Sequence, residues 1–416
     1  MTEAPSPAGT SSSNLLTMLG SGFLTNPYPA YANLQSSSPV LWAPGVFGIG
    51  AWIATSHAIC SSVLRDKRFI KEGQRVLSPE KMAMIPVEGN ADLMERRRSN
   101  MLFRDPPDHT RLRGLVNQAF TPRQVDRLRP HIASIAESLI NDMASKGSGD
   151  LLRDFAFPLP IIVIAELLGV PPEHRDQFKI WSSDLTLGLS PLLTNDDLEK
   201  VRRAIEPMDE YIGGIVEARR REPRQDLISE LVRVQDAGDR LSMNELLATC
   251  RLLLTAGHET TVNLIGNGSL ALLRNPEQRA MLAADESLLP NAVEELLRYD
   301  SPVQLTMRFA SEDAPLGNQA AKRGDLVVLL LGAANRDPAH FSNPQELDIR
   351  RENAGTHLSL GQGIHYCLGA PLARLEGELA IGALLRRLPR LALAEGELEW
   401  RPNIVLRGLK SLPVTF

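Results

Sequence analysis

The chain has 416 residues, 43% hydrophobic and 23% charged, and its 45 basic and 50 acidic side chains give a formal charge of −5. This composition is typical of a folded globular protein, and its acidic balance excludes the clustered excess of Lys and Arg that a nucleic-acid surface needs. The longest apolar runs, 158–165 and 326–334, fall far short of the roughly 20 residues that cross a bilayer. No basic and then apolar leader opens the chain, so we expect neither a signal peptide nor a membrane anchor.

The predicted elements of the first quarter of the chain are short. From the N-terminus the pattern predicts a flexible tail, a rigid turn, a short helix, a strand and a second helix, at residues 1–13, 26–29, 30–34, 52–55 and 58–64. The segment 77–100 is interrupted by Met, Pro and Gly and predicts a long loop with one short helix. Loops of this length in compact domains are often functional.

Helices dominate from residue 110 onward, because apolar residues recur at i, i+3, i+4 and i+7. The predicted helices cover 110–119, 125–146, 160–168, 173–187, 196–221, 226–236, 243–273, 291–299 and 370–388, and a buried strand covers 326–331. At about 1.5 Å per residue, the helix 243–273 would cross most of a large domain. No repeat or linker divides the chain, so we expect one mainly α domain with small β-sheets over residues 14–416.

Three widely spaced cysteines, Cys60, Cys250 and Cys367, do not make a disulfide framework. The chain also lacks the CxxC and HxxxH pairs of a structural zinc site. We therefore expect a reducing cytoplasmic location. One of the three thiols lies in an unusual setting.

That thiol belongs to Leu360-Gly361-Gln362-Gly363-Ile364-His365-Tyr366-Cys367-Leu368-Gly369, which places three glycines around one cysteine before a predicted helix. Glycine permits positive φ and close backbone approach, and exposed N–H groups at a helix N-terminus favour a thiolate. The alternative is a buried structural cysteine. The glycine spacing favours a thiolate suited to be an axial ligand of haem iron.

A second motif, Ala256-Gly257-His258-Glu259-Thr260-Thr261, lies in the middle of the longest predicted helix. Glycine inside a helix costs about 1 kcal/mol relative to alanine. The Thr260 hydroxyl can bind the carbonyl of Ala256 and open the helix locally, which would leave a groove with a hydroxyl, a carboxylate and water. The structural alternatives are a solvated polar spot and a helix–helix contact through Gly257.

Two further motifs are weak when each is taken alone. Glu295 and Arg298 form an i,i+3 pair, which is usually a surface pair worth a few tenths of a kcal/mol. His109 and Arg113 lie one helical turn apart and can face the same anion, although most such basic turns are solvated.

In this order along the chain, the four motifs resemble those of the cytochrome P-450 family of haem-thiolate monooxygenases. The sequences Asp105-Pro106-Pro107-Asp108, Ala334-Asn335-Arg336-Asp337-Pro338 and Ala370-Pro371-Leu372-Ala373-Arg374 add to the resemblance, which covers residues 26–416. The motifs look most like those of soluble bacterial enzymes that modify polyketides and other natural products. The resemblance implies a haem b enclosed between the long central helix and the cysteine loop.

The resemblance also implies roles for single residues. Cys367 would be the iron ligand within a loop shaped by Leu360, Gly363 and Gly369, and the haem propionates would be contacted by His109, Arg113, Arg308 and His365. Glu259 and Thr260 would deliver protons to dioxygen, beside Ala256 and with Gly257 giving clearance above the haem. Glu295 and Arg298 would form a structural network with Arg350. Leu360 departs from the family, which usually has Phe there, and this affects the redox potential rather than ligation.

By the same resemblance, the substrate pocket would be lined by Met84, Ile85, Leu93, Leu187, Leu253, Val303, Leu305, Ile404 and Val405. These side chains are apolar and indicate a neutral, bulky, hydrophobic substrate, although some of them would be ordinary core residues. A polyketide or macrolide is the expected class, and a fatty acid or terpenoid is the alternative.

The expected activity is insertion of one oxygen atom from O2, as hydroxylation or epoxidation. A peroxide-driven hydroxylase and a non-catalytic haem or ligand-binding protein are alternatives, and both would be expected to lack the Glu259–Thr260 pair. Electrons would come from NAD(P)H through a separate ferredoxin and reductase, because no flavin or iron–sulfur motif follows residue 395. Arg111 and Arg374 would lie on the docking face of a monomeric enzyme.

Overall fold

The structure is a computed structural model that describes residues 20, 22–85, 99–119, 121–190, 194–236 and 241–416. The predicted tail over residues 1–13 and the candidate pocket residue Leu93 lie outside the described part. Within that part, no helix is both long and apolar enough to cross a membrane.

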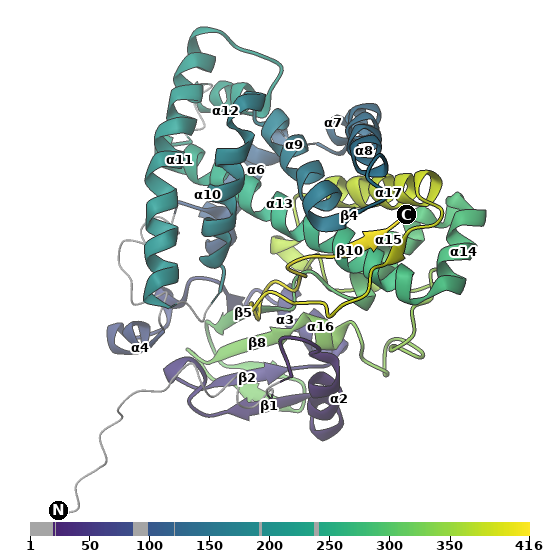
Figure 1. The fold of residues 1–416 in the computed structure, drawn as a ribbon. Helices are drawn as coiled ribbons and strands as arrows, with labels where there is room; N and C mark the ends of the chain where they lie inside the picture. Colours follow the sequence, from purple (N-terminus) through teal and green to yellow (C-terminus); the bar gives the residue numbers. More distant parts are fainter. Residues whose placement is uncertain (1–19, 21, 86–98, 120, 191–193, 237–240) are drawn as a thin grey trace, which may run out of the picture.

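Most of the described chain is helical, as expected (Figure 1). The helices are α2 (Tyr28–Ser37), α3 (His57–Arg65), α4 (Pro79–Met84), α6 (Asp108–Ala119), α7 (Pro122–Arg127), α8 (Arg129–Ala144), α9 (Pro158–Leu167), α10 (Arg175–Leu187), α11 (Asn195–Arg221), α12 (Leu227–Asp236), α13 (Met243–Arg274), α14 (Pro276–Ala284), α15 (Leu289–Tyr299), α16 (Leu331–Ala334) and α17 (Ala370–Arg387).

A five-stranded sheet lies at one end of the molecule, beside α2 (Figure 1). Its order is β1 (Val40–Ala43), β2 (Ala51–Ala54), β8 (Leu326–Leu330), β5 (Leu305–Ala310) and β3 (Phe69–Ile70). Only β2 and β8 run parallel, with Ile53 opposite Val328. Every residue of β8 is buried, because this continuous apolar run is central in the sheet and is covered on both faces.

Two smaller sheets complete the β structure of the described residues. One joins β4 (Ser148–Asp150), β10 (Pro413–Thr415) and β9 (Ala392–Leu393), and the other pairs β6 (Ala314–Leu316) with β7 (Gln319–Ala321). The C-terminal strand is thereby fixed to the helical part of the fold.

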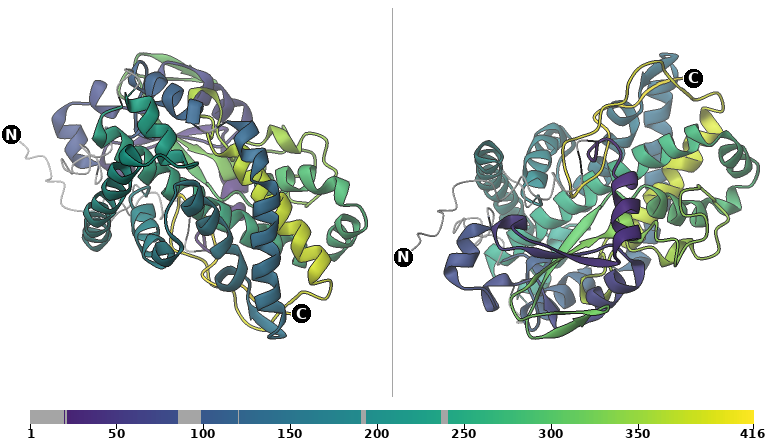
Figure 2. Two further views of the ribbon diagram at one scale, coloured as in Figure 1. Left: turned by 90° about the horizontal axis from the view of Figure 1, so that it is seen from above. Right: turned by 90° about the horizontal axis from the view of Figure 1, so that it is seen from below.

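The central helix α13 begins with a capping box, in which the Ser242 side chain accepts from the Glu245 N–H and the Glu245 side chain accepts from the Ser242 N–H. It packs against α9, α10, α15 and α17 and passes through the middle of the helical region (Figure 1). Because α13 has neighbours on several sides, most of its residues are buried. On one side of this region α8 and α17 pack against each other (Figure 2).

The structure corrects two of the predicted helices. The predicted helix 125–146 is divided between α7 and α8, with Pro130 in the first turn of α8. Proline has no N–H to continue the earlier helix and fits a helix start instead. The Thr260 hydroxyl binds Ala256 as predicted, but α13 remains helical throughout, so the expected local opening is wrong. Helix α14 is an additional element that the sequence reading omitted.

Candidate active site

The cysteine loop has the conformation that its glycines permit. Gly361 and Gly363 have φ values of +68° and +69°, a region that side chains disfavour. A Cβ at Gly363 would lie 2.3 Å from the Leu64 carbonyl oxygen of α3. The Cys367 N–H donates to the Leu360 carbonyl at 2.8 Å and closes the loop. The positive φ that the glycines permit is present, and at Gly363 it allows a close approach to α3.

The sulfur of Cys367 lies half-buried at the start of α17. Gly369 has an ordinary φ of −80°, and a Cβ there would lie 4.0 Å from Sγ. Burial raises the pKa of the Cys367 thiol, although the backbone N–H groups of Gly369 and Ala370 and the charge of Arg113 oppose this. The N–H groups thus favour the thiolate as expected from the sequence, while burial acts against it. A bound metal cation would supply the missing positive charge, since metals bind the deprotonated thiol.

Helix α6 and strand β5 place basic side chains beside this loop. Arg113 donates to the carbonyls of Ile364 (3.1 Å) and Tyr366 (2.7 Å). The His109 ring lies 4.4 Å from the ring of His365. Burial lowers the pKa of His365 to about 3 and that of Arg308 to about 10. Four residues from distant parts of the sequence thus meet on one side of the cysteine loop.

Two of these groups lack the hydrogen-bond partner that buried polar atoms normally have, and the third has only neutral partners. His109 Nδ1 and His365 Nε2 are buried without a hydrogen-bond partner among the described residues. Arg308 is 3% exposed, and its guanidinium donates to two neutral oxygens, the Met307 carbonyl (2.8 Å) and Thr306 Oγ1 (3.3 Å). A buried cation and two unpaired imidazole nitrogens suit an anion with carboxylate groups. The residues present therefore fit a haem with its propionates here.

The acid and the alcohol of α13 are both held by hydrogen bonds. Thr260 Oγ1 donates to the Ala256 carbonyl at 2.6 Å. Glu259 is 3% exposed, and its Oε1 forms an ion pair with Arg401, a residue of the irregular segment before β10. Its Oε2 has no hydrogen-bond partner among the described residues. Sequence reasoning missed Arg401, because no motif surrounds it.

Gly257 lies against a neighbouring helix on one side. A Cβ at Gly257 would contact Ile164 of α9 at 3.8 Å. The glycine therefore lies at the contact between α13 and α9, in agreement with the helix–helix contact that the sequence also allowed. His258 beside it is fully buried, and burial lowers its pKa to about 3. Its Nδ1 lies 3.3 Å from Ser182 Oγ of α10.

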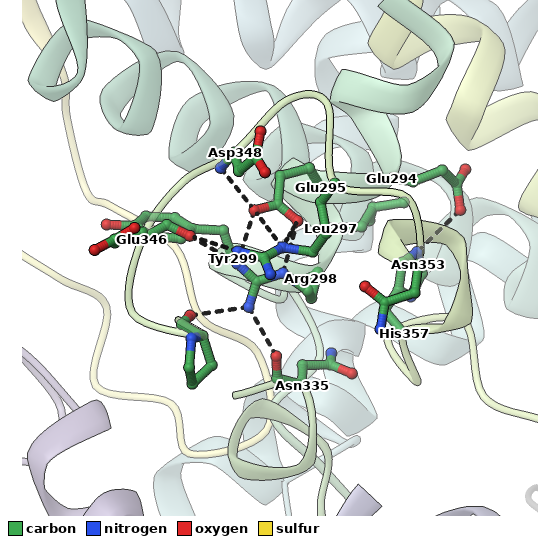
Figure 3. A network of polar contacts seen from close by, with 12 residues as sticks. Glu294, Glu295, Leu297, Arg298, Tyr299, Asn335, Glu346, Asp348, Asn353 and His357 are labelled. Atoms are coloured by element: carbon green, nitrogen blue, oxygen red, sulfur yellow. Dashed lines mark hydrogen bonds and ion pairs between the residues drawn. The ribbon is translucent and has the colours of Figure 1, made fainter. Parts of the chain in front are cut away.

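Glu295 and Arg298 of α15 form the predicted structural network (Figure 3). Both are fully buried, and Arg298 makes two hydrogen bonds to Glu295, of 2.6 and 2.8 Å. Arg298 also donates to the carbonyls of Asn335 and Glu346, at 2.9 and 3.0 Å. The prediction of Arg350 as the third member is wrong. Arg351 binds Glu295 instead.

The two arginines predicted to face a redox partner are already paired within the chain. Arg111 forms an ion pair with Glu245 at the start of α13. Arg374 binds Glu294 and donates to the Tyr366 hydroxyl at 2.9 Å. Although burial opposes it, the hydrogen bonds from His357 and Arg374 lower the pKa of Glu294 to about 2. A docking partner would therefore compete with these internal pairs.

The predicted pocket residues fall into two groups. Ile85, Val303, Leu305, Ile404 and Val405 pack in one apolar cluster, which joins the sheet to the C-terminal segment. Three others do not belong to it. Met84 is exposed, Leu187 packs against Val201 and Ile205 of α11, and Leu253 packs in the main helical core.

Comparison with known proteins decides the family. The family model described as Cytochrome P450 matches residues 177–399. The polyketide biosynthesis cytochrome P450 PksS of Bacillus subtilis (strain 168) is 42% identical over 402 residues, which cover 95% of this chain and 97% of that protein. The chain belongs to the cytochrome P450 family.

Two other cytochrome P450 comparisons agree. The cytochrome P450 monooxygenase PikC of Streptomyces venezuelae is 43% identical over 405 residues, covering 96% of this chain and 93% of that protein. The solved structure of P450BioI with hexadec-9Z-enoic acid ligated acyl carrier protein matches with a TM-score of 0.88 and 40% identity, covering 95% of this chain and all of that chain. The predicted fold class and family are confirmed. The protein is a cytochrome P450 oxygenase, and membership of the family implies a haem cofactor, O2 and an organic substrate.

Proposed function

We propose that this cytochrome P450 inserts one atom of O2 into a hydrophobic polyketide, by hydroxylation or epoxidation. The observation that carries the proposal is the acid–alcohol pair on α13, with Glu259 buried and Thr260 bound to Ala256. A peroxide-driven hydroxylase or a non-catalytic haem protein would have no use for this pair. The polyketide class is supported by the 42% identity to PksS and by the apolar cluster of Ile85, Leu305 and Ile404.

The cofactor would be a b-type haem, which supplies the iron at which dioxygen is activated. Cys367 would be its protein ligand, in a loop that Gly363 allows to lie close against α3, while Gly369 places no side chain beside the sulfur. Arg308, His109 and His365 would hold the propionates, since His109 Nδ1 and His365 Nε2 are buried without a partner among the described residues and Arg308 donates only to neutral oxygens. Arg113 would fix the loop through the Ile364 and Tyr366 carbonyls, within reach of the same propionates, and Leu360 would tune the redox potential.

On the other side of the site, Glu259 would take up protons on its buried carboxylate. Thr260 would hold a proton at Oγ1 and pass it on toward the reacting oxygen, a role that suits a hydroxyl fixed by one hydrogen bond. Ala256 would supply the carbonyl that orients this hydroxyl. Glu295, Arg298 and Arg351 would act only by holding the fold around the cysteine loop.

Electrons would come from NAD(P)H through a separate ferredoxin and its reductase. The docking face would lie around the cysteine loop, where Ile364 and Tyr366 are exposed and where Arg111 and Arg374 would exchange their internal partners for acidic groups. We further propose that residues 14–416 form this haem domain behind a flexible tail, and that the enzyme acts as a cytoplasmic monomer.

A second candidate function is oxidation of a fatty acyl chain, either free or attached to an acyl carrier protein. It is favoured by the likeness to P450BioI, which was solved with a hexadec-9Z-enoic acid ligated acyl carrier protein. Such a chain is also neutral, long and apolar, and it would suit the same cluster.

The test combines purified haem-loaded protein with a surrogate ferredoxin, its reductase and NAD(P)H. The substrates are polyketide macrolactones, free fatty acids and acyl carrier protein loaded with a fatty acid. We expect the spin-state shift of substrate binding and a product with one added oxygen only in the polyketide arm. Product only in an acyl arm would favour the second candidate. Turnover with hydrogen peroxide that exceeds turnover with NAD(P)H would contradict the proposed use of O2.

The ligand assignment has its own control set. Cys367→Ser should remove the strongly red-shifted Soret band of the reduced carbon monoxide complex, while Cys60→Ser and Cys250→Ser should keep it. Both control cysteines are fully buried, and neither belongs to the loop. A normal band in Cys367→Ser would exclude this residue as the ligand.

A further inference from the structure

The two carboxylate oxygen atoms of Glu259 lie in different environments. Oε1 is paired with Arg401, whose side chain is 28% exposed and so extends from the buried acid toward solvent. Oε2 is buried and has no partner among the described residues. A buried polar atom left unsatisfied costs about 1–3 kcal/mol, and buried water normally fills this need.

Two amides continue the face of α13 on which Glu259 lies. Asn263 and Asn267 follow it at intervals of four residues, which places all three side chains on one face over successive turns. Both amides are 2% exposed. Asn263 Nδ2 and Asn267 Oδ1 are again buried without a partner among the described residues. Three successive turns of the helix therefore each present an unsatisfied polar atom.

The C-terminal segment covers this polar face. The Arg407 carbonyl accepts a hydrogen bond from Asn267 Nδ2 at 3.0 Å. Gly408 lies directly against Asn263, because a Cβ at this glycine would be 1.9 Å from Asn263 Oδ1. Arg401 meets Glu259 at the other end and also lines a small cavity with Trp400 and Asn403.

The C-terminal segment is itself held in place by hydrogen bonds and an ion pair, so its position over the polar face of α13 is fixed by the fold. The Arg401 N–H donates to the Gly408 carbonyl at 2.9 Å. The Arg407 guanidinium binds Asp300 at 2.7 Å and stacks on Trp400 at 3.5 Å from the ring centre. The contact between α13 and this segment is thus a fixed interface with polar groups on its helical side.

We propose that Arg401 is a positioning residue for proton supply, which holds Glu259 beside a buried hydrated track formed with Asn263 and Asn267. Water in the track would bridge Oε2 and the two amides, which can both donate and accept, and would hand protons to Glu259. Arg401 would hold Oε1 and thereby leave Oε2 for this water. The inference rests on the proposed role of Glu259 in proton delivery.

The first test measures coupling, as product formed per NAD(P)H consumed, with hydrogen peroxide assayed in parallel. Arg401→Met should lower coupling about tenfold, a modest share of the 10²–10⁴ typical of proton-transfer groups, and Arg401→Lys should restore most of it. Asn263→Leu, which keeps the side-chain size, should behave like Arg401→Met. Substrate affinity should change less than twofold in all three variants. Turnover driven by added hydrogen peroxide should be preserved, which a merely structural defect would not allow.

Lys410→Met is the matched control, because Lys410 is an exposed cation of the same segment and is paired with Glu399. It should keep wild-type coupling. Glu259→Gln separates the two hypotheses. If it is fully coupled, the proposed role of Glu259 fails. If it is uncoupled while Arg401→Met and Asn263→Leu behave as wild type, the present inference alone is overturned.

The second test does not depend on activity. A high-resolution crystal structure of the haem-loaded enzyme should show ordered water within hydrogen-bond distance of Glu259 Oε2, Asn263 Nδ2 and Asn267 Oδ1. In Asn263→Leu the central water should be lost while the Arg401–Glu259 pair remains. A dry interface in the wild-type enzyme would overturn the track, whatever the coupling results.

Discussion

Arg351 Nε lies 3.1 Å from Glu295 Oε2, although 56 residues separate them in the sequence. One fully buried carboxylate is thereby shared by two arginines, because Arg298 binds the same group. Arg351 also donates to the carbonyls of Ser342 and Glu346. It therefore fastens the irregular segment before the cysteine loop to α15. Its neighbour Arg350 is exposed.

This difference gives a matched pair of variants. Arg351→Ala leaves a buried carboxylate short of one partner and should destabilise the protein by about 3–5 kcal/mol. Arg350→Ala removes an exposed side chain and should change stability by no more than about 0.5 kcal/mol. Urea denaturation of both haem-loaded variants, followed by circular dichroism, measures the difference. Equal effects would contradict the assignment of Arg351.

Arg350 and Arg351 also show which part of the site the sequence can predict and which it cannot. The spacing of Glu295 and Arg298 identified the helix turn, and the resemblance implied a third arginine downstream. Arg350 and Arg351 are adjacent and chemically identical, however, so the choice depends on the backbone direction after Asp348. The long apolar period of α13 and the Thr260–Ala256 bond were predictable, because both depend on contacts within one helix.

Contacts between segments that are distant in the sequence were harder to predict. Arg401 lies in an irregular segment without periodicity, and only the fold brings it to Glu259, 142 residues away. The contact of Gly257 with Ile164 could not be predicted, because helix spacing gives relative directions but does not say which neighbour each face meets. Leu187 and Leu253 were apolar and in the expected segments, yet each packs into a different core.

The glycines of the cysteine loop should differ sharply in their tolerance of a side chain. Gly363→Ala needs a positive φ and meets the Leu64 carbonyl at 2.3 Å, so it should cost about 1–3 kcal/mol and lower the haem-to-protein ratio. Gly369→Ala has an ordinary φ and should fold normally. Thermal unfolding and pyridine haemochrome titration measure both effects. A Gly363→Ala protein with full haem content and normal stability would refute the tight approach to α3.

Arg308 should matter for cofactor retention more than an exposed arginine of the same region. Its buried guanidinium has no carboxylate partner among its hydrogen bonds, so the haem propionates would supply one. Removing one charged donor should cost about 1.5–3 kcal/mol of affinity, which is roughly tenfold or more. Haem transfer to an apo-globin from Arg308→Gln should be faster by this factor, and Arg323→Gln, at an exposed position between β7 and β8, should match the wild type. Unchanged transfer from Arg308→Gln would remove this residue from the propionate site.

Glu376 of α17 gives a prediction about pH. It is 1% exposed, and burial raises its pKa from 4.5 to about 8, although a hydrogen bond with Thr261 opposes the shift. Below pH 4.5 the folded and unfolded chains both hold this proton, so the group has no effect on stability. Between pH 4.5 and 8 only the unfolded chain releases it, and stability falls through this window by up to roughly 5 kcal/mol. Glu376→Gln removes the ionisable group and keeps its size. The stability of this variant should equal that of the wild type near pH 4.5 and exceed it above pH 8.

Urea denaturation across this range measures the difference in stability. Glu378→Gln, on the same helix, is the control and should gain no stability over the wild type in this window. A stability difference that stays constant with pH would show that Glu376 is ionised in the folded protein, and a buried partner for its charge would then have to exist.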